Sequence, residues 1–124
     1  MSFEKLFVYG TLRTGGSRNQ ILDSDSCVIA TVQGELFDLG TFPGAKFGGY
    51  RDGKIVGEIH TIDSSMFRVL DVMEAEGILY ERVRIKATTE TGEIVEVWAY
   101  EFLLPTYTHP KIASGDYFEH ISKT

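Results

Sequence analysis

The sequence predicts one small domain of the α+β class that is mostly β, a β-barrel with few helices. Four segments are rich in β-branched and aromatic residues, which favour strands. These segments are residues 28–36, 55–61, 79–87 and 94–102. A sustained helical spacing of apolar residues is evident in one stretch, residues 63–77. A chain of 124 residues fits a single domain, residues 1–124, that buries roughly two thirds of its unfolded surface.

The first element is an apolar run at residues 6–8, which predicts a short strand that leads into a glycine-bearing polar loop. Gly10 tolerates the positive φ that a sharp exit from a strand often demands. At the end of the loop, the hydroxyl of Ser17 is expected to cap a short helix. Ile21 and Leu22 would give that helix an apolar edge.

This loop is also a candidate anion site, because successive free backbone amides form a concavity that binds carboxylates or phosphates. Gly10, Gly15 and Ser17 stand where a P-loop has its two glycines and its metal-binding hydroxyl. Gly16, however, stands where the P-loop lysine would be. Nucleotide hydrolysis is therefore disfavoured, and two interpretations stay open: a carboxylate cradle and a tight surface turn.

The middle of the chain predicts two further strands. Residues 28–36 alternate in character and predict a long strand with a bulge or bend at Gly34. Turn-forming residues fill 38–44, and a hairpin signal at 51–54 precedes the strand at 55–61.

Residues 63–77 predict an amphipathic helix, for which Asp63 offers the N-cap. The helix is expected to end near residues 75–77. The apolar stripe expected to pack on the sheet consists of Met66, Val69, Leu70 and Met73.

The last third of the chain predicts a hairpin followed by a loop-rich tail. Residues 79–87 and 94–102 flank a turn at 90–93 and alternate in character, as antiparallel strands do. From residue 104 the pattern dissolves into turn-forming residues. Three aromatic residues of this tail are expected to dock on the barrel: Tyr107, Tyr117 and Phe118.

Composition limits the classes of partner and the cellular location that we expect for the protein. The formal net charge is −6 and no cluster of Lys or Arg is present, which opposes binding to nucleic acid. No apolar run approaches the ~20 residues of a membrane helix, so we expect no membrane contact and a cytoplasmic location. Cys27 is the only cysteine, which excludes an intrachain disulfide and suggests a buried, inert thiol.

No cofactor and no metal are expected. His60, His109 and His120 are scattered without the spacing of metal ligands, so we expect structural or solvent-facing roles for them. A zinc hydrolase is therefore disfavoured. The sequence also lacks the Gly-x-Ser-x-Gly elbow that exposes a nucleophilic serine.

Five segments form an ordered pattern along nearly the whole chain. The first is Tyr9-Gly10-Thr11-Leu12-Arg13, and the next two cover residues 34–44 and 56–59. The fourth joins Leu70-Asp71-Val72-Met73-Glu74 to Leu79-Tyr80-Glu81-Arg82, and the last is Ser114-Gly115-Asp116-Tyr117. Taken together, this pattern resembles the γ-glutamylcyclotransferase-like family, the AIG2-like group.

The resemblance implies a small mixed β-barrel with flanking helices and a cofactor-independent enzyme. Such an enzyme releases an amine and 5-oxoproline from a small γ-glutamyl amide, because the substrate's own α-amine attacks its γ-carbonyl. One carboxylate can take the proton from the α-ammonium and return it to the departing amine. We expect a monomer or a weak homodimer. The alternative is a non-catalytic module on the same fold that binds an acidic metabolite.

The resemblance also nominates the site residues. Glu74 matches the glutamate of the family's Leu-Asp-x-x-Glu motif and is the expected general acid/base. The family often has glycine directly after this glutamate, whereas Ala75 follows here, so a shifted alignment would nominate Glu76 instead. The residues expected to bind substrate are Tyr9, Gly10, Thr11, Leu12, Arg13 and Tyr100.

Two further charged residues have open roles. Glu58 lies in a predicted strand between apolar neighbours, as either a second candidate for the site or an outward-facing residue. Arg82 matches an arginine of the family, and we expect it to pair structurally with a carboxylate. Arg13 is expected to be exposed and to steer an anionic substrate.

Overall fold

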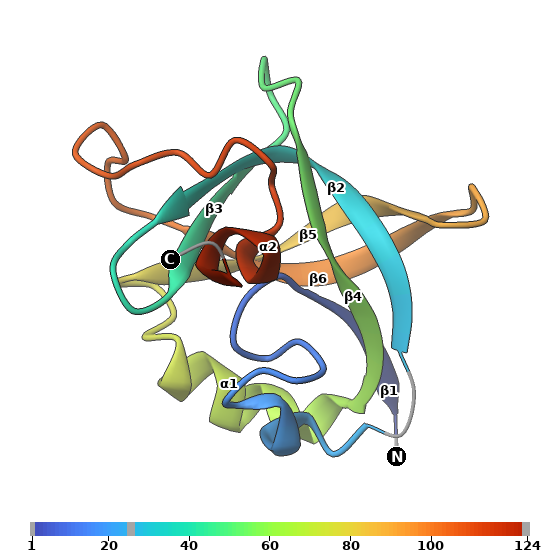
Figure 1. The fold of residues 1–124 in the computed structure, drawn as a ribbon. Coiled ribbons are helices and arrows are strands. Elements are labelled where there is room, and N and C mark those ends of the chain that lie inside the picture. The colour runs from blue at the N-terminus through green and yellow to red at the C-terminus, as the bar shows by residue number, and fades with distance from the viewer. Residues whose placement is uncertain (1, 25–26, 123–124) are drawn as a thin grey trace.

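Five strands close into a barrel at the centre of the protein (Figure 1). The computed structural model describes residues 2–24 and 27–122. In barrel order the strands are β2 (Cys27–Asp38), β4 (Lys54–Asp63), β1 (Phe3–Val8), β6 (Ile94–Phe102) and β5 (Tyr80–Thr89). Strand β5 pairs with β2 again and so closes the barrel. The prediction of a mostly β barrel is confirmed.

The second half of strand β1, Leu6 to Val8, is buried on both faces, which explains the apolar run there. It pairs antiparallel with β4 and parallel with β6, where Leu6 lies beside Trp98. Phe7 belongs to the core inside the barrel. Leu6 and Val8 belong to a second core, which also contains Leu70 of the helix outside the barrel. The end of β1 therefore lies where both cores meet.

Strand β2 changes partner at Gly34. Residues Cys27 to Gln33 pair with β4, and residues Gly34 to Asp38 pair with β3 (Pro43–Phe47). A Cβ on Gly34 would lie 2.3 Å from the carbonyl oxygen of Lys46, so only glycine allows this approach. The sequence pattern did not indicate β3, because it begins with proline and glycine and lies at an edge of the sheet, where proline costs no ladder hydrogen bond.

The helical segments are short. They are η1 (Asn19–Leu22), η2 (Ser64–Met66), α1 (Phe67–Met73) and α2 (Tyr117–Ser122). The prediction for Asp63 is confirmed, since its Oδ1 accepts a hydrogen bond from the amide of Ser65 at 2.9 Å. The prediction for Ser17 is wrong: Arg18 precedes η1, and its side chain makes no capping hydrogen bond.

Two predicted packing details are also wrong. Val69 is 52% exposed, and the buried face of α1 consists of Phe67 and Leu70 instead. Tyr107 is 88% exposed, whereas Tyr117 and Phe118 do pack on the core inside the barrel. The last two lie on α2, which the loop-rich composition of the tail did not predict. None of the helices in the described ranges is long and apolar enough to cross a membrane.

Helix α1 ends in a Schellman motif. The amide of Glu76 donates to the carbonyl of Asp71 at 2.9 Å, and the amide of Ala75 donates to the carbonyl of Val72 at 3.1 Å. Ala75 occupies the left-handed position of the motif, with φ of 49°, where glycine is usual. Glu74 is the last residue before this reversal, so the motif fixes where its side chain leaves the helix.

We expect Ala75→Gly to raise the free energy of unfolding by about 0.5–1 kcal/mol. Glycine removes the left-handed penalty of ~1–2 kcal/mol and returns part of that gain through the greater entropy of its unfolded chain. Urea denaturation measures the change. Ala113→Gly is the control, because Ala113 is exposed without a positive φ and should lose stability. A variant at position 75 no more stable than the parent would contradict this explanation.

Candidate functional site

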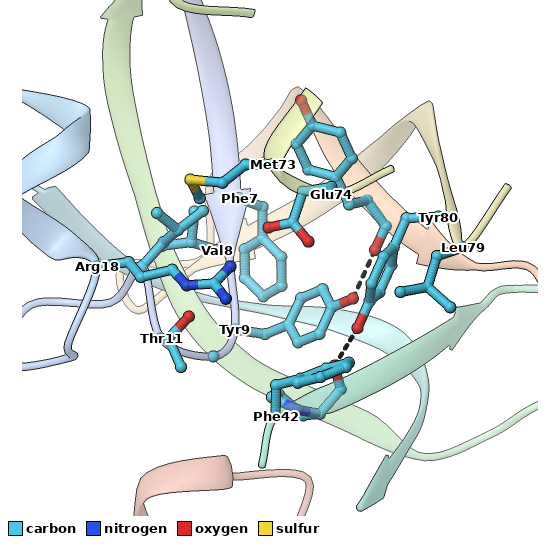
Figure 2. A pocket seen from close by; sticks show the side chains of 14 residues that line it. Phe7, Val8, Tyr9, Thr11, Arg18, Phe42, Met73, Glu74, Leu79 and Tyr80 are labelled. Carbon is cyan, nitrogen blue, oxygen red and sulfur yellow. Dashed lines mark hydrogen bonds between the residues drawn. The ribbon is translucent and has the colours of Figure 1, made fainter. Parts of the chain in front are cut away.

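A cavity of about 180 Å³ opens beside the end of β1 (Figure 2). The loop after β1 forms one wall, and the end of α1 with the start of β5 forms another. Most of its lining is aromatic or aliphatic, including Phe7, Phe42, Met73 and Leu79. Five of the six residues predicted to bind substrate line it: Tyr9, Gly10, Thr11, Leu12 and Tyr100.

Glu74 carries the only carboxylate among the described residues that line this cavity. Figure 2 shows its carboxylate pointing into the space beside Phe7 and Tyr9. Burial raises the pKa of Glu74, and the positive charge of Arg18 opposes this shift. The alternative, Glu76, is exposed and does not line the cavity; its carboxylate accepts a hydrogen bond from the amide of Arg82 at 3.2 Å.

The loop opposite Glu74 presents backbone amides. The amide of Arg13 donates to the carbonyl of Gly10 at 3.0 Å, and the amide of Arg18 donates to the carbonyl of Thr11 at 2.9 Å, which fixes a tight turn. Within the described chain, the amides of Gly10, Thr11 and Leu12 have no acceptor. These three residues line the cavity, which makes their amides candidate donors to a bound anion.

Gly10 is required for packing rather than for its φ. The expectation of a positive φ is wrong, because Gly10 is not among the glycines in that region. A Cβ at this position would lie 2.8 Å from Cγ and 2.9 Å from Cδ of Pro43. The loop therefore approaches the start of β3 so closely that a side chain would force the two apart.

Three tyrosines of the cavity wall donate hydrogen bonds to neighbouring residues through their hydroxyl groups. The hydroxyl of Tyr9 donates to the carbonyl of Tyr100 at 2.6 Å, and that of Tyr80 donates to the carbonyl of Pro43 at 2.7 Å. The hydroxyl of Tyr100 donates to Oδ1 of Asp71 at 2.6 Å. Burial raises the pKa of all three, so they remain neutral donors. Tyr100 lines the cavity while its hydroxyl is already bonded.

Asp71 bonds both to Tyr100 of this wall and to Arg82. The expectation that Arg82 pairs structurally with a carboxylate is confirmed. Nε of Arg82 lies 2.9 Å from Oδ1 of Asp71, and Nη2 lies 3.2 Å from Oδ2. The guanidinium stacks over the rings of Phe67 and Trp98, at 4.1 and 4.7 Å from their centroids. The arginine therefore ties α1 to the barrel at the helix turn that carries Glu74.

The structure corrects the prediction for Arg13, which does not line the cavity. Its side chain is only 11% exposed and makes ion pairs with Asp116 at 2.9 Å and Glu58 at 3.7 Å. It also lies over the ring of Phe118, 4.4 Å from the centroid. The tight turn after Gly10 directs it to the side of the loop away from the cavity. Arg18 is the arginine that lines the cavity, and the sequence analysis missed it.

Glu58 holds this loop from the other side. It is 6% exposed, and its Oε1 accepts hydrogen bonds from the amide of Thr14 at 2.8 Å and the hydroxyl of Thr14 at 3.0 Å. Nε2 of His60 lies 2.9 Å from the same oxygen. Burial alone would raise the pKa of Glu58, but the hydrogen bonds from Thr14 and His60 outweigh it and hold that pKa below its usual value.

Cys27 joins the edge of this polar cluster and is exposed, so the expectation of a buried thiol is wrong. Its Sγ, the carboxylate of Glu58 and the imidazole of His60 lie within 4.8 Å of one another, a grouping of metal-capable donors. Sequence spacing did not reveal it, because Cys27 and His60 meet only through the pairing of β2 with β4. Glu58 and His60 already bond to each other there.

We expect Arg13→Ala to lower the free energy of unfolding by about 3 kcal/mol, because it leaves the buried carboxylate of Glu58 without its cation. Arg51→Ala is the control: Arg51 pairs with Glu35 at 3.1 Å nearer the surface and should cost about 1 kcal/mol or less. Urea denaturation compares the two variants. Equal losses would show that the Arg13 pair does not anchor the loop.

Known proteins resemble this chain in both sequence and fold. A family model described as "Gamma-glutamyl cyclotransferase, AIG2-like" matches residues 6–119. A Vibrio cholerae protein named provisionally as a gamma-glutamylcyclotransferase is 29% identical over 119 residues, covering 94% of this chain and 96% of that protein. Gamma-glutamylaminecyclotransferase from Bos taurus is 28% identical over 95 residues, covering 68% of this chain and 56% of that protein.

Among solved structures, YkqA from Bacillus subtilis superposes with a TM-score of 0.80 at 31% sequence identity. The match covers 98% of this chain but only 43% of the YkqA chain. The present chain thus spans about half the length of the Bos taurus and Bacillus subtilis relatives and nearly the whole Vibrio cholerae protein. Because the family model covers nearly all of the barrel and the cavity, the chain belongs to the gamma-glutamyl cyclotransferase, AIG2-like family.

Proposed function

We propose that the protein is a cofactor-independent γ-glutamylcyclotransferase that releases an amine and 5-oxoproline from a small γ-glutamyl amide. The observation that carries this proposal is the position of Glu74. Its carboxylate has a raised pKa and lies in a largely apolar cavity opposite backbone amides that have no acceptor in the described chain. Family membership supports the same reaction.

Glu74 acts first as a base and then as an acid. It takes a proton from the α-ammonium of the substrate, and the freed amine attacks the γ-carbonyl to close a five-membered lactam. The bond from the γ-carbon to the departing nitrogen breaks, and Glu74 returns its proton to that nitrogen. The attacking nitrogen loses its second proton as the lactam forms, and the released amine, which is far more basic than the lactam, takes up a proton and leaves as an ammonium. A carboxyl whose pKa is raised toward neutrality gives and takes protons more evenly than an ordinary glutamate, which suits this double role.

The loop after β1 binds the α-carboxylate through the amides of Gly10, Thr11 and Leu12. This places the carboxylate across the cavity from Glu74, which faces the α-ammonium. A volume of about 180 Å³ favours a compact substrate folded back on itself. Holding that conformer is the largest catalytic contribution, because well-oriented intramolecular attack reaches effective molarities of ~10⁵–10⁸ M.

We expect Glu74→Gln to lower kcat by about 10²–10⁴-fold, the usual contribution of a general acid/base, while leaving the melting temperature and substrate binding largely intact. The amide keeps the shape of the side chain but cannot carry the proton. Release of 5-oxoproline from a panel of γ-glutamyl amides is the assay, with thermal shifts as the binding readout.

Glu76→Gln is the matched control and should retain most activity, because Glu76 is exposed outside the cavity. If it is the inactive variant while Glu74→Gln still turns over, the assignment of the acid/base is wrong. Thermal shifts with no product from the parent protein would favour the binding module over the enzyme.

We expect kcat/KM to fall as the pH drops through the pKa of Glu74 in the free enzyme, because the base must be ionised to accept a proton. Burial raises this pKa, so the midpoint of the acid limb should lie above the ordinary glutamate value of about 4.3. The control Glu76→Gln should keep the same midpoint. An acid limb at or below 4.3 would contradict a buried glutamate base.

A further inference from the structure

A group of metal-capable side chains lies outside the cavity. Cys27, Glu58 and His60 each offer one donor atom, and these three atoms lie within 4.8 Å of one another. None of the three residues lines the cavity, and the proposed reaction uses none of them. The expectation of no metal rested on spacing along the chain, which does not reveal donors that meet through strand pairing.

The sheet holds the three donors on one of its faces. Cys27 of β2 lies directly opposite His60 of β4 in the antiparallel ladder, so their side chains leave the sheet on the same side. Glu58 stands two residues before His60 on β4, and the two-residue period of a strand puts its side chain on that side as well. Two regular strands therefore bring the donors together.

The spacing of the donor atoms suits a small cation. Nε2 of His60 lies 2.9 Å from Oε1 of Glu58. The hydroxyl oxygen of Thr14 lies 3.0 Å from the same Oε1 and 3.6 Å from Sγ of Cys27. Neighbouring ligands of a tetrahedral zinc ion are about 3.3–3.8 Å apart, as bonds of ~2.0–2.3 Å require. Cys27 can supply most of the adjustment, because it is exposed at the first residue of β2.

The imidazole of His60 has an unsatisfied nitrogen. The residue is 2% exposed, and its Nδ1 finds no hydrogen-bond partner in residues 2–24 and 27–122. A buried nitrogen without a partner costs stability, and a bound ion is one of the reasons for which such a residue is retained. A histidine at this position is therefore explained better by a ligand than by packing.

The local charges accommodate a divalent cation. Coordination releases the thiol proton of Cys27 to solvent, so the group gains a thiolate beside the carboxylate of Glu58. Arg13 lies 3.7 Å from that carboxylate and 2.9 Å from the carboxylate of Asp116. Two carboxylates and one thiolate then balance the guanidinium and one doubly charged ion. Thiolate and imidazole ligands favour zinc over Mg²⁺ and Ca²⁺, which prefer oxygen.

We propose that Cys27, Glu58 and His60 bind a zinc ion through Sγ, a carboxylate oxygen and Nε2, with the hydroxyl of Thr14 beside the ion. The ion joins β2, β4 and the loop after β1 at one point, because Thr14 belongs to that loop. It stabilises the fold next to the cavity without entering the cavity. This inference does not depend on the proposed reaction.

Titration of the chelator-treated protein with Co²⁺ tests the proposal, because Co²⁺ replaces zinc in tetrahedral sites and a thiolate ligand adds charge-transfer absorption in the near ultraviolet. We expect one ion per chain, displaced by Zn²⁺. Cys27→Ser should remove the charge-transfer band and weaken Zn²⁺ binding by more than the about 10- to 100-fold that loss of an outer-shell partner costs. His109→Gln is the control and should bind as the parent does, since His109 packs on Phe102 outside the group.

Two further measurements leave the buried donors unchanged. In NMR spectra of ¹⁵N-labelled protein, Zn²⁺ should shift the resonance of Nε2 of His60 more than that of Nδ1. Zn²⁺ should also slow the alkylation of the exposed Cys27 by iodoacetamide, whereas Mg²⁺ should not.

Equal affinity in the parent and in Cys27→Ser, or a cobalt complex without thiolate absorption, would overturn the proposal, because the ion would then lie elsewhere. Imidazole resonances of His60 that do not respond to Zn²⁺ would overturn it as well and reduce the contact to the thiol alone. A shift confined to Nδ1 would remove Glu58 from the ligands, since Nε2 would still be bonded to its carboxylate.

Discussion

The half-buried carboxylate of Glu74 is the constraint on which this site depends, because a carboxylate in an apolar cavity is stable only if its position is enforced. The Schellman turn at Ala75 directs Glu74 out of the helix, and the Asp71–Arg82 pair ties that turn to the barrel. Ala75 holds a left-handed conformation that most residues avoid. The local strain and the raised pKa thus occur in adjacent residues, as is common where a site is preorganised.

The loop after β1, which forms the opposite wall of the cavity, is held by a different set of contacts. Glu58 accepts hydrogen bonds from Thr14 and pairs with Arg13, so the loop after β1 is anchored on the side that faces away from the cavity. Gly10 lets the same loop press against Pro43. The residues of the turn, Gly10, Thr11 and Leu12, line the cavity, and their amides have no acceptor in the described chain. The contacts of Glu58 thus hold the loop, and the amides on the cavity side are the ones to which the proposed reaction assigns the substrate carboxylate.

The barrel was predictable because the sequence patterns that mark its strands are local. Alternating residues mark β5 and β6, and Asp63 marks the start of the segment that becomes η2 and α1. The lining of the cavity was predictable only where the family motif names a residue, as for Glu74. Arg13 and Arg18 occupy one loop, and the turn between them decides which of the two lines the cavity. No residue pattern predicted the geometry of that turn. Likewise, strand pairing alone brings Cys27 beside His60.

The central claim is that the substrate's own amine closes the ring, and the fate of that nitrogen tests it most directly. γ-Glutamyl-alanine labelled with ¹⁵N at the α-amine of its glutamyl group is incubated with the protein, and the products are followed by NMR. We predict that the label appears in the lactam nitrogen of 5-oxoproline together with unlabelled alanine. Labelled free glutamate would mean that water, rather than the amine, attacks the γ-carbonyl, and would contradict the cyclotransferase mechanism.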